Sequence, residues 1–174
     1  MAAKVVFEVL YKEYYVRVFG LCRMLLNSAP LAEDATQETF MRAYRHFDRY
    51  DTALPFWQWI ASIANNYCVD QMRKKNRTEK LFGDEEVEFG QASSLDQHLL
   101  AALVDHEDAQ ALNNAIAQLP DKYRVPLVLA YFNDASYEQI AKDLAISRSH
   151  VGVLLLRAKQ QLRSYIASAH DQDS

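Results

Sequence analysis

Apolar side chains recur at every third or fourth position over most of the first 75 residues and again from about Leu99 onward. The pattern is clearest between Val5 and Leu26, where the apolar positions are Val6, Leu10, Tyr14, Val18, Leu21 and Leu25. Such spacing gathers apolar groups on one face of an α-helix. The 174 residues include only four glycines and four prolines, so few positions oppose helix formation. The sequence therefore predicts an all-α fold.

Residues that start helices divide the first half of the chain into three expected helices. After the first helix, Ser28 is a suitable N-cap, and Pro30 suits the first turn of a second helix that ends near Phe47. Pro55 is expected to open a third helix that continues to about Lys75. On the second helix, the side chains expected to be buried are Ala35, Phe40 and Tyr44, or near neighbours of these.

A short helix, a tight turn and a longer helix are expected near the C-terminus. Ser136 and Gln139 form a capping box for the short helix, which ends near Leu144, and Ser147 can cap the longer one. This is the outline of a helix-turn-helix, although other helical hairpins share it. The apolar residues placed to pack the two helices together are Ile140, Leu144, Ile146, Val151 and Leu155.

Charge is unevenly distributed along a chain whose formal net charge is −4. Residues 1–77 hold 11 basic and 8 acidic side chains, whereas residues 78–110 hold one basic and nine acidic side chains. The acidic stretch contains two glycines and shows no sustained period, which is typical of a flexible linker. We therefore expect two small helical domains, residues 1–77 and 107–174, joined by an acidic linker, residues 78–106.

The sequence offers no arrangement typical of an enzyme, a metal site or a membrane protein. Cys22 and Cys68 lie in helical patterns among apolar neighbours, which favours two reduced core thiols over a disulfide. No apolar run approaches the roughly 18–20 residues that span a bilayer, and the N-terminus is too charged for a signal peptide. We expect a cytoplasmic protein without cofactor or metal. The histidines lack metal-ligand spacing: His46, His98, His106, His150 and His170.

The segment Pro55–Arg77 combines aromatic and basic side chains within an acidic protein. It reads PFWQWIASIANNYCVDQMRKKNR. Aromatic rings stack on unpaired bases and basic groups contact phosphates, so this composition favours a nucleic-acid surface. Burial in a helix core is the alternative for Trp59 and its helical neighbours. We assign Trp59 to the core and leave Phe56 and Trp57 unassigned.

Two sets of residues match a known family in order and spacing. The set in the second expected helix is Glu33, Asp34, Gln37, Glu38 and Phe40. The set in the third is Trp59, Ile63, Ala64, Asn66, Asp70 and Arg73. Together with the helix-turn-helix, they resemble the extracytoplasmic-function (group 4) sigma factors of bacterial RNA polymerase, in which conserved regions 2 and 4 are joined by a linker. The resemblance covers nearly the whole chain apart from the linker.

The resemblance implies a role in promoter-specific transcription initiation. In the family, the polar face of the second helix docks on the clamp coiled coil of the largest polymerase subunit. In this chain, the residues of that face would be Glu33, Asp34, Gln37 and Glu38. A solvated charged face is the alternative. The third helix and the loop before it would hold the unpaired non-template strand of the −10 element through Tyr50, Ile63, Asn66, Arg73, Lys74, Lys75 and Arg77.

The expected recognition helix, SHVGVLLLRAK, departs from the family pattern. Gly152, Val153 and Leu154 stand where the family often has Lys, Ser and Arg. Helical geometry predicts a buried face made of Val151, Leu155, Ala158 and Leu162. The residues expected at the −35 element are Ser149, His150, Val153, Leu156 and Arg157. Direct readout of the bases would depend on Arg157, with Val153 or Leu156 making apolar contacts to thymine methyl groups.

The resemblance also implies the partners. They are core RNA polymerase, promoter DNA and a membrane-associated anti-sigma factor. The anti-sigma factor would hold the chain at the inner face of the membrane. The acidic linker would either thread through a basic polymerase interior or remain a solvated tether. Two alternatives stay open: a sigma-mimic adaptor that titrates an anti-sigma factor, which the unusual recognition helix favours, and a stand-alone helix-turn-helix regulator.

Overall fold

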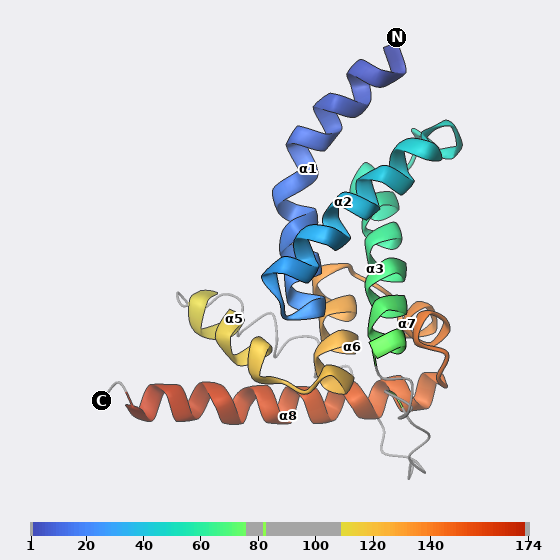
Figure 1. Cartoon of the computed structure of the whole chain (residues 1–174). Helices are drawn as coiled ribbons and strands as arrows, with labels where there is room; N and C mark the ends of the chain where they lie inside the picture. The colour runs from blue at the N-terminus through green and yellow to red at the C-terminus, as the bar shows by residue number, and fades with distance from the viewer. Residues whose placement is uncertain (1, 76–81, 83–108, 173–174) are drawn as a thin grey trace. The chain divides into compact units, whose positions relative to one another are not determined.

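The computed structural model describes residues 2–75, 82 and 109–172 (Figure 1). The chain divides into two compact units, Met1–Arg77 and Thr78–Ser174. All regular secondary structure in the described ranges is helical, so the prediction of an all-α fold with two helical domains is confirmed. None of the helices in these ranges combines the length and the apolar character needed to cross a bilayer.

The first unit consists of three helices that each pack against the other two. They are α1 (Ala2–Leu26), α2 (Ala29–Arg45) and α3 (Phe56–Lys75), with a short 3-10 helix, η1 (Phe47–Arg49), after α2. The predicted starts are confirmed, because the Ser28 side chain accepts a hydrogen bond from the Leu31 amide at 3.4 Å, and Pro55 lies immediately before α3.

Small side chains cover the inner face of α2. Its buried positions include Ala32, Ala35, Thr36, Thr39 and Ala43, all fully enclosed. The two threonine hydroxyls each donate to the carbonyl four residues earlier at 2.7 Å, so neither loses a partner on burial. Residues of this size let α1 and α3 approach α2 closely, so the outward side chains of α2 stand on a firmly held backbone.

The first turns of α1 bury Phe7 instead of the neighbouring Val6. Val6 is 51% exposed, whereas Phe7 is 8% exposed. The Phe7 ring meets the rings of Phe40, Tyr44 and Phe47 edge-on, at centroid distances between 5.1 and 6.4 Å. The first apolar position is therefore Phe7 instead of Val6, because the larger ring reaches the aromatic side chains of α2, whereas Leu10 and Tyr14 are half-buried. At the Tyr44 position the buried side chain is that of its neighbour Ala43, and Tyr44 itself is 54% exposed.

The second unit contains four described helices, and three of them pack against the last one. They are α5 (Ala109–Gln118), α6 (Asp121–Phe132), α7 (Tyr137–Leu144) and α8 (Arg148–Gln172). In Figure 1, α8 is the long red helix. Helix α6 is buried from Tyr123 to Leu129, including Arg124, whose guanidinium donates to the Leu119 carbonyl at 2.9 Å and pairs with Asp121.

Candidate functional site

The outward face of α2 carries the acidic and amide side chains singled out in the sequence. Glu33, Asp34 and Gln37 are exposed, while Glu38 is half-buried and forms an ion pair with Arg42 at 3.0 Å. The Arg42 guanidinium in turn lies 5.0 Å from the ring centre of Tyr67 on α3. Burial raises the pKa of the Tyr67 phenol, and the negative charge of Glu38 raises it further. Glu38 is thus engaged within the unit, whereas Asp34 and Gln37 face outward.

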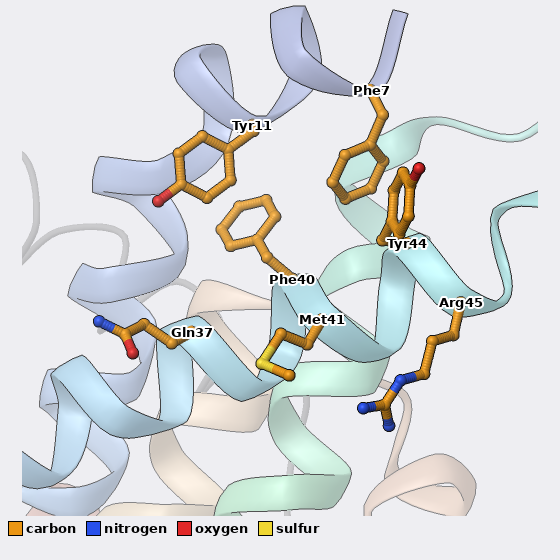
Figure 2. Close-up of a pocket in the computed structure, with 7 residues that line it drawn as sticks. All are labelled: Phe7, Tyr11, Gln37, Phe40, Met41, Tyr44 and Arg45. Carbon is orange, nitrogen blue, oxygen red and sulfur yellow. The ribbon is translucent and has the colours of Figure 1, made fainter. Parts of the chain in front are cut away.

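An apolar pocket adjoins Gln37 in the groove between α1 and α2 (Figure 2). Its volume is about 430 Å³, and it is lined by Phe7, Tyr11, Gln37, Phe40, Met41, Tyr44 and Arg45. In Figure 2 the Phe40 ring points toward α1 between the rings of Tyr11 and Phe7, and Gln37 and Arg45 lie at opposite ends. Met41 and Tyr44 are among the exposed large apolar side chains. An exposed apolar hollow with polar ends has the composition of a protein-binding surface.

Tyr50 lies in a cluster of aromatic rings before the start of α3. Its ring centre is 5.0 Å from that of Trp59, 5.5 Å from that of Phe56 and 6.0 Å from that of Phe47. The Tyr50 hydroxyl donates to the Leu54 carbonyl at 2.6 Å, which closes the loop between η1 and α3. Tyr50 is therefore held in place by its neighbours and remains half-buried.

Phe56 and Trp57, which the sequence analysis left unassigned, and Trp59, which it assigned to the core, have three different environments. Phe56 is buried. Trp59 is half-buried, so its assignment to the core is confirmed only for part of its ring. Trp57 is also half-buried: the Arg17 guanidinium lies 3.8 Å above its ring, and Tyr14 stacks beside it at 6.5 Å.

A stripe of family-matching residues runs along the outer face of α3. Trp59 and Ile63 are half-buried, and Asn66, Asp70 and Arg73 are exposed, with intervals of four and three residues that keep them on one side of the helix. Arg73 lies 3.9 Å from Asp70. The basic residues Arg73, Lys74 and Lys75 occupy the last turn, where cations are favoured by the helix dipole. Arg77 lies outside the described residues.

The helix-turn-helix of the second unit is closed by local hydrogen bonds. The Ser136 hydroxyl caps α7 by accepting from the Gln139 amide at 3.1 Å, and Ser147 caps α8 by accepting from the His150 amide at 3.1 Å. The Gln139 side chain donates to Asp143 at 2.9 Å, so the capping box expected from the sequence is formed in one direction. In the turn, Ala145 adopts a left-handed conformation with φ of 56°.

Helix α8 buries a wide face. The four residues predicted to be buried, Val151, Leu155, Ala158 and Leu162, are all buried. Leu154 and His150 are buried as well, and the histidine residue is 4% exposed. Ser149 and Arg157 are exposed, and Val153 and Leu156 are half-buried. Of the residues expected at the −35 element, His150 is therefore the one whose side chain does not reach the surface of the unit.

Comparisons with known proteins match both units. Sigma-70 region 2 matches residues 10–78, and Sigma-70, region 4 matches residues 109–162. The chain is 34% identical over 160 residues to the ECF RNA polymerase sigma factor SigW of Bacillus subtilis, covering 88% of this chain and 84% of that protein. This chain belongs to the ECF sigma factors. It is also 30% identical over 156 residues to the ECF RNA polymerase sigma factor SigM of B. subtilis, covering 89% and 91% of the two chains.

A solved structure shares the fold of this ECF sigma factor. The sigma factor RpoE of Bartonella quintana, crystallised with the anti-sigma factor NepR, matches with a TM-score of 0.59 and 20% identity. The match covers 92% of this chain and 96% of that one. Family membership confirms the expected function class, a sigma factor that acts with RNA polymerase in promoter-specific transcription initiation.

Sequence reasoning missed three features of this sigma factor that depend on tertiary contacts. They are the pocket beside Gln37, the Glu38–Arg42–Tyr67 network, and the Arg17–Trp57 contact. The pocket left a signal in the sequence, because aromatic residues stand four apart at Phe7 and Tyr11 and again at Phe40 and Tyr44. Two such pairs on neighbouring helices indicate an aromatic contact between them.

Proposed function

We propose that this ECF sigma factor binds core RNA polymerase with the outward face of α2, opens the −10 element with the outer stripe of α3, and contacts the −35 element with α8. Residues 1–77 act as region 2 and residues 107–174 act as region 4. One observation carries the proposal above the others: the stripe on α3 begins at the aromatic cluster around Tyr50 and ends at the basic last turn. A separated strand needs rings for its bases and cations for its phosphates, in that spatial order.

Docking on polymerase uses Glu33, Asp34 and Gln37 together with the pocket beside them. Exposed polar groups at the rim of an apolar hollow are suited to a partner that inserts an apolar side chain and hydrogen-bonds around it. Glu38 contributes mainly by holding Arg42, since the two are already paired at 3.0 Å. Reversing the charge at Glu38 would therefore affect the packing of the unit as well as docking on polymerase. A substitution at Asp34 tests docking alone.

A charge reversal at Asp34 tests the docking surface. Asp34→Lys should weaken assembly with core polymerase while the helix content stays unchanged. The matched control is Glu13→Lys, because Glu13 is also an exposed acid and lies on α1. Assembly can be measured by fluorescence titration of core polymerase with labelled chain. Equal weakening by both variants would mean a general charge effect and would remove Asp34 from the docking surface.

Promoter opening is assigned to Tyr50, Ile63, Asn66 and the basic last turn of α3 with Arg77. Asn66→Ala should slow open-complex formation more than holoenzyme assembly, because its amide would bond the edge of a base extruded from the duplex. The matched control is Asn114→Ala on α5, which is also exposed. A premelted promoter bubble should rescue much of the defect. An Asn66→Ala chain that opens duplex promoters at the wild-type rate contradicts the assignment.

At the −35 element we assign the contacts to Ser149, Val153, Leu156 and Arg157. We leave His150 out of the contact set because a buried imidazole cannot reach a base edge. Two half-buried apolar side chains and one exposed arginine provide few polar contacts. We therefore expect recognition by α8 to rely on thymine methyl groups and phosphate contacts, and region 2 to supply much of the promoter selectivity.

Regulation by an anti-sigma factor is part of the proposal. The solved relative from B. quintana is a complex with an anti-sigma factor. We propose that the present chain also has an anti-sigma factor, that this inhibitor is membrane-associated, and that it holds the chain at the inner face of the membrane until a signal releases it. The acidic linker, residues 78–106, lies outside the described residues apart from Phe82, which is buried. We propose that its negative charge complements a basic partner surface.

A further inference from the structure

The outer side of α1 carries a line of exposed valines. Val5, Val9 and Val16 are 61%, 58% and 79% exposed. At about 100° per residue, these three side chains lie within roughly 40° of one another, so they follow one line along the helix, which we call the valine line. Val6, which is also exposed, lies beside it. Monomeric proteins seldom leave several large apolar side chains aligned in water, so this line has the composition of a contact surface.

The valine line lies opposite the side of α1 that packs into the unit. Val18, Leu21 and Leu25 are buried, and the same helical geometry places them about half a turn away from the valines. The valines are therefore not needed for the core of the first unit. The α2 face and the α3 stripe belong to other helices, so the functions proposed above leave the valine line without a role.

Two opposite charges border the valine line on one side. Glu8 and Lys12 are both exposed, and they stand four residues apart on the same side of the line. Neither side chain forms an ion pair with another residue of the described chain. Glu13, which is also exposed, borders the line on its other side. The line thus has an acid and a base available for a partner.

We propose that the valine line binds a second copy of this chain, with the two α1 helices antiparallel about a twofold axis. In this pair, Val5 of one copy lies opposite Val16 of the other, and Val9 packs on the aliphatic stem of Lys12. A twofold axis brings the same sides of the two helices together. Glu8 of each copy therefore meets Lys12 of the other copy, which gives two ion pairs across one interface.

The charges disfavour the other simple arrangements. In a parallel pair in register, Lys12 would face Lys12 of the other copy, and Glu8 would lie near Glu13. Like charges in contact destabilise such a pair, so they select the antiparallel one. An anionic membrane surface is disfavoured as a partner, because acids border the line on both sides.

A contact between two single helices is small. It buries less than the roughly 1,200 Å² at which standard protein interfaces begin, so the pair is weak and depends on concentration. We expect monomers at about 1 μM and dimers at about 100 μM. The inference does not rest on the proposed function, because self-association can be measured without polymerase or DNA.

Sedimentation of the full chain over this concentration range tests the proposal. Val9→Glu should remain monomeric throughout, because two carboxylates would enter the interface. The matched control is Leu31→Glu on α2, which also replaces an exposed apolar side chain and should dimerise like the wild type. Circular dichroism should show the same helix content for all three chains, since both substituted side chains are exposed.

A charge exchange tests the antiparallel pairing itself. Glu8→Lys and Lys12→Glu should each weaken dimerisation by roughly tenfold, because each variant brings like charges together at both contacts. An equimolar mixture of the two variants should dimerise like the wild type, since the mixed pair has opposite charges at both contacts. A change in the stability of α1 within one chain cannot produce this recovery.

Three results would overturn the proposal. The first is a wild-type chain that stays monomeric at about 100 μM, which would mean that the second unit or a different partner covers the valine line. The second is a dimer that Val9→Glu leaves intact. The third is a mixture of Glu8→Lys and Lys12→Glu chains that associates no more tightly than either variant alone.

Discussion

Replacing Tyr50 by alanine should impair promoter opening more than assembly of the holoenzyme. The ring of Tyr50 contacts Phe47, Phe56 and Trp59, and its hydroxyl closes the loop to Leu54. The substitution removes a surface on which an unpaired base could stack and also removes the support for the Trp59 ring. It leaves the outward face of α2 intact, because Tyr50 lies beyond the end of that helix.

The expected size of the defect follows from these contacts. Loss of stacking on one base costs about 1–3 kcal/mol, which corresponds to roughly a 5- to 150-fold slower opening step. Tyr50→Phe removes only the hydrogen bond from the Tyr50 hydroxyl to the Leu54 carbonyl. Because Leu54 is exposed, water can replace the hydroxyl as the donor to this carbonyl. That variant should lose at most about 1 kcal/mol of stability and should open promoters nearly as fast as the wild type.

The assay compares duplex and premelted promoters for three chains. Open-complex formation is followed by permanganate reactivity of unpaired thymines, and holoenzyme formation is measured separately. Tyr50→Ala should be slow on the duplex and largely rescued on the premelted template. Tyr44→Ala serves as the contrasting tyrosine, because Tyr44 lines the α1/α2 pocket and its loss should weaken assembly with polymerase without rescue. If Tyr50→Ala weakens assembly and gains nothing from premelting, the base-binding role is refuted.

Three further predictions concern stability and can be checked by thermal or urea unfolding. Ala145→Gly should stabilise the second unit by about 1 kcal/mol, because Ala145 has a positive φ of 56° that glycine adopts without strain; no gain would mean that the turn relaxes. Gly20→Ala should stabilise the first unit by about 0.5–1 kcal/mol, since an added methyl group in mid-helix meets nothing within 4 Å; a loss would indicate a hidden clash. Arg124→Leu should destabilise the second unit by about 1–3 kcal/mol, because the Leu119 carbonyl loses its buried donor while Asp121 can reach water; unchanged stability would contradict that accounting.

Much of the fold could be predicted because its signals are local. Ser28, Ser136 and Ser147 each cap the helix that their sequence context indicates, since an N-cap interacts with amides only two or three residues away. The apolar spacing likewise predicted the buried face of α8 from Val151 to Leu162. These features depend on neighbours along the chain, which a single sequence contains in full.

What could not be predicted depends on neighbours from other helices. Spacing alone did not distinguish Val6 from Phe7, because the choice between these two neighbours is decided by the rings of α2 that Phe7 contacts. His150 was expected at the surface, but α8 is covered by three helices, so its buried face is wider than one stripe. In the candidate site, the outward position of Asp34 followed from helical geometry, whereas Asn66 was identified from the family resemblance. The pairing of the half-buried Glu38 with Arg42 did not follow, since such a pair on one helix contributes only about 0.3–0.5 kcal/mol, and the Arg42 guanidinium also contacts the Tyr67 ring of α3.

The central claim is that this chain directs core RNA polymerase to specific promoters. The most direct measurement is transcription of genomic DNA by core polymerase with and without the purified chain, followed by sequencing of the 5′ ends of the transcripts. The account predicts new start sites that share two upstream elements at constant spacing, and it predicts that Asn66→Ala greatly reduces transcription from them. A chain that binds polymerase or an inhibitor but leaves the start sites identical to those of core polymerase alone would contradict the account and favour an adaptor role.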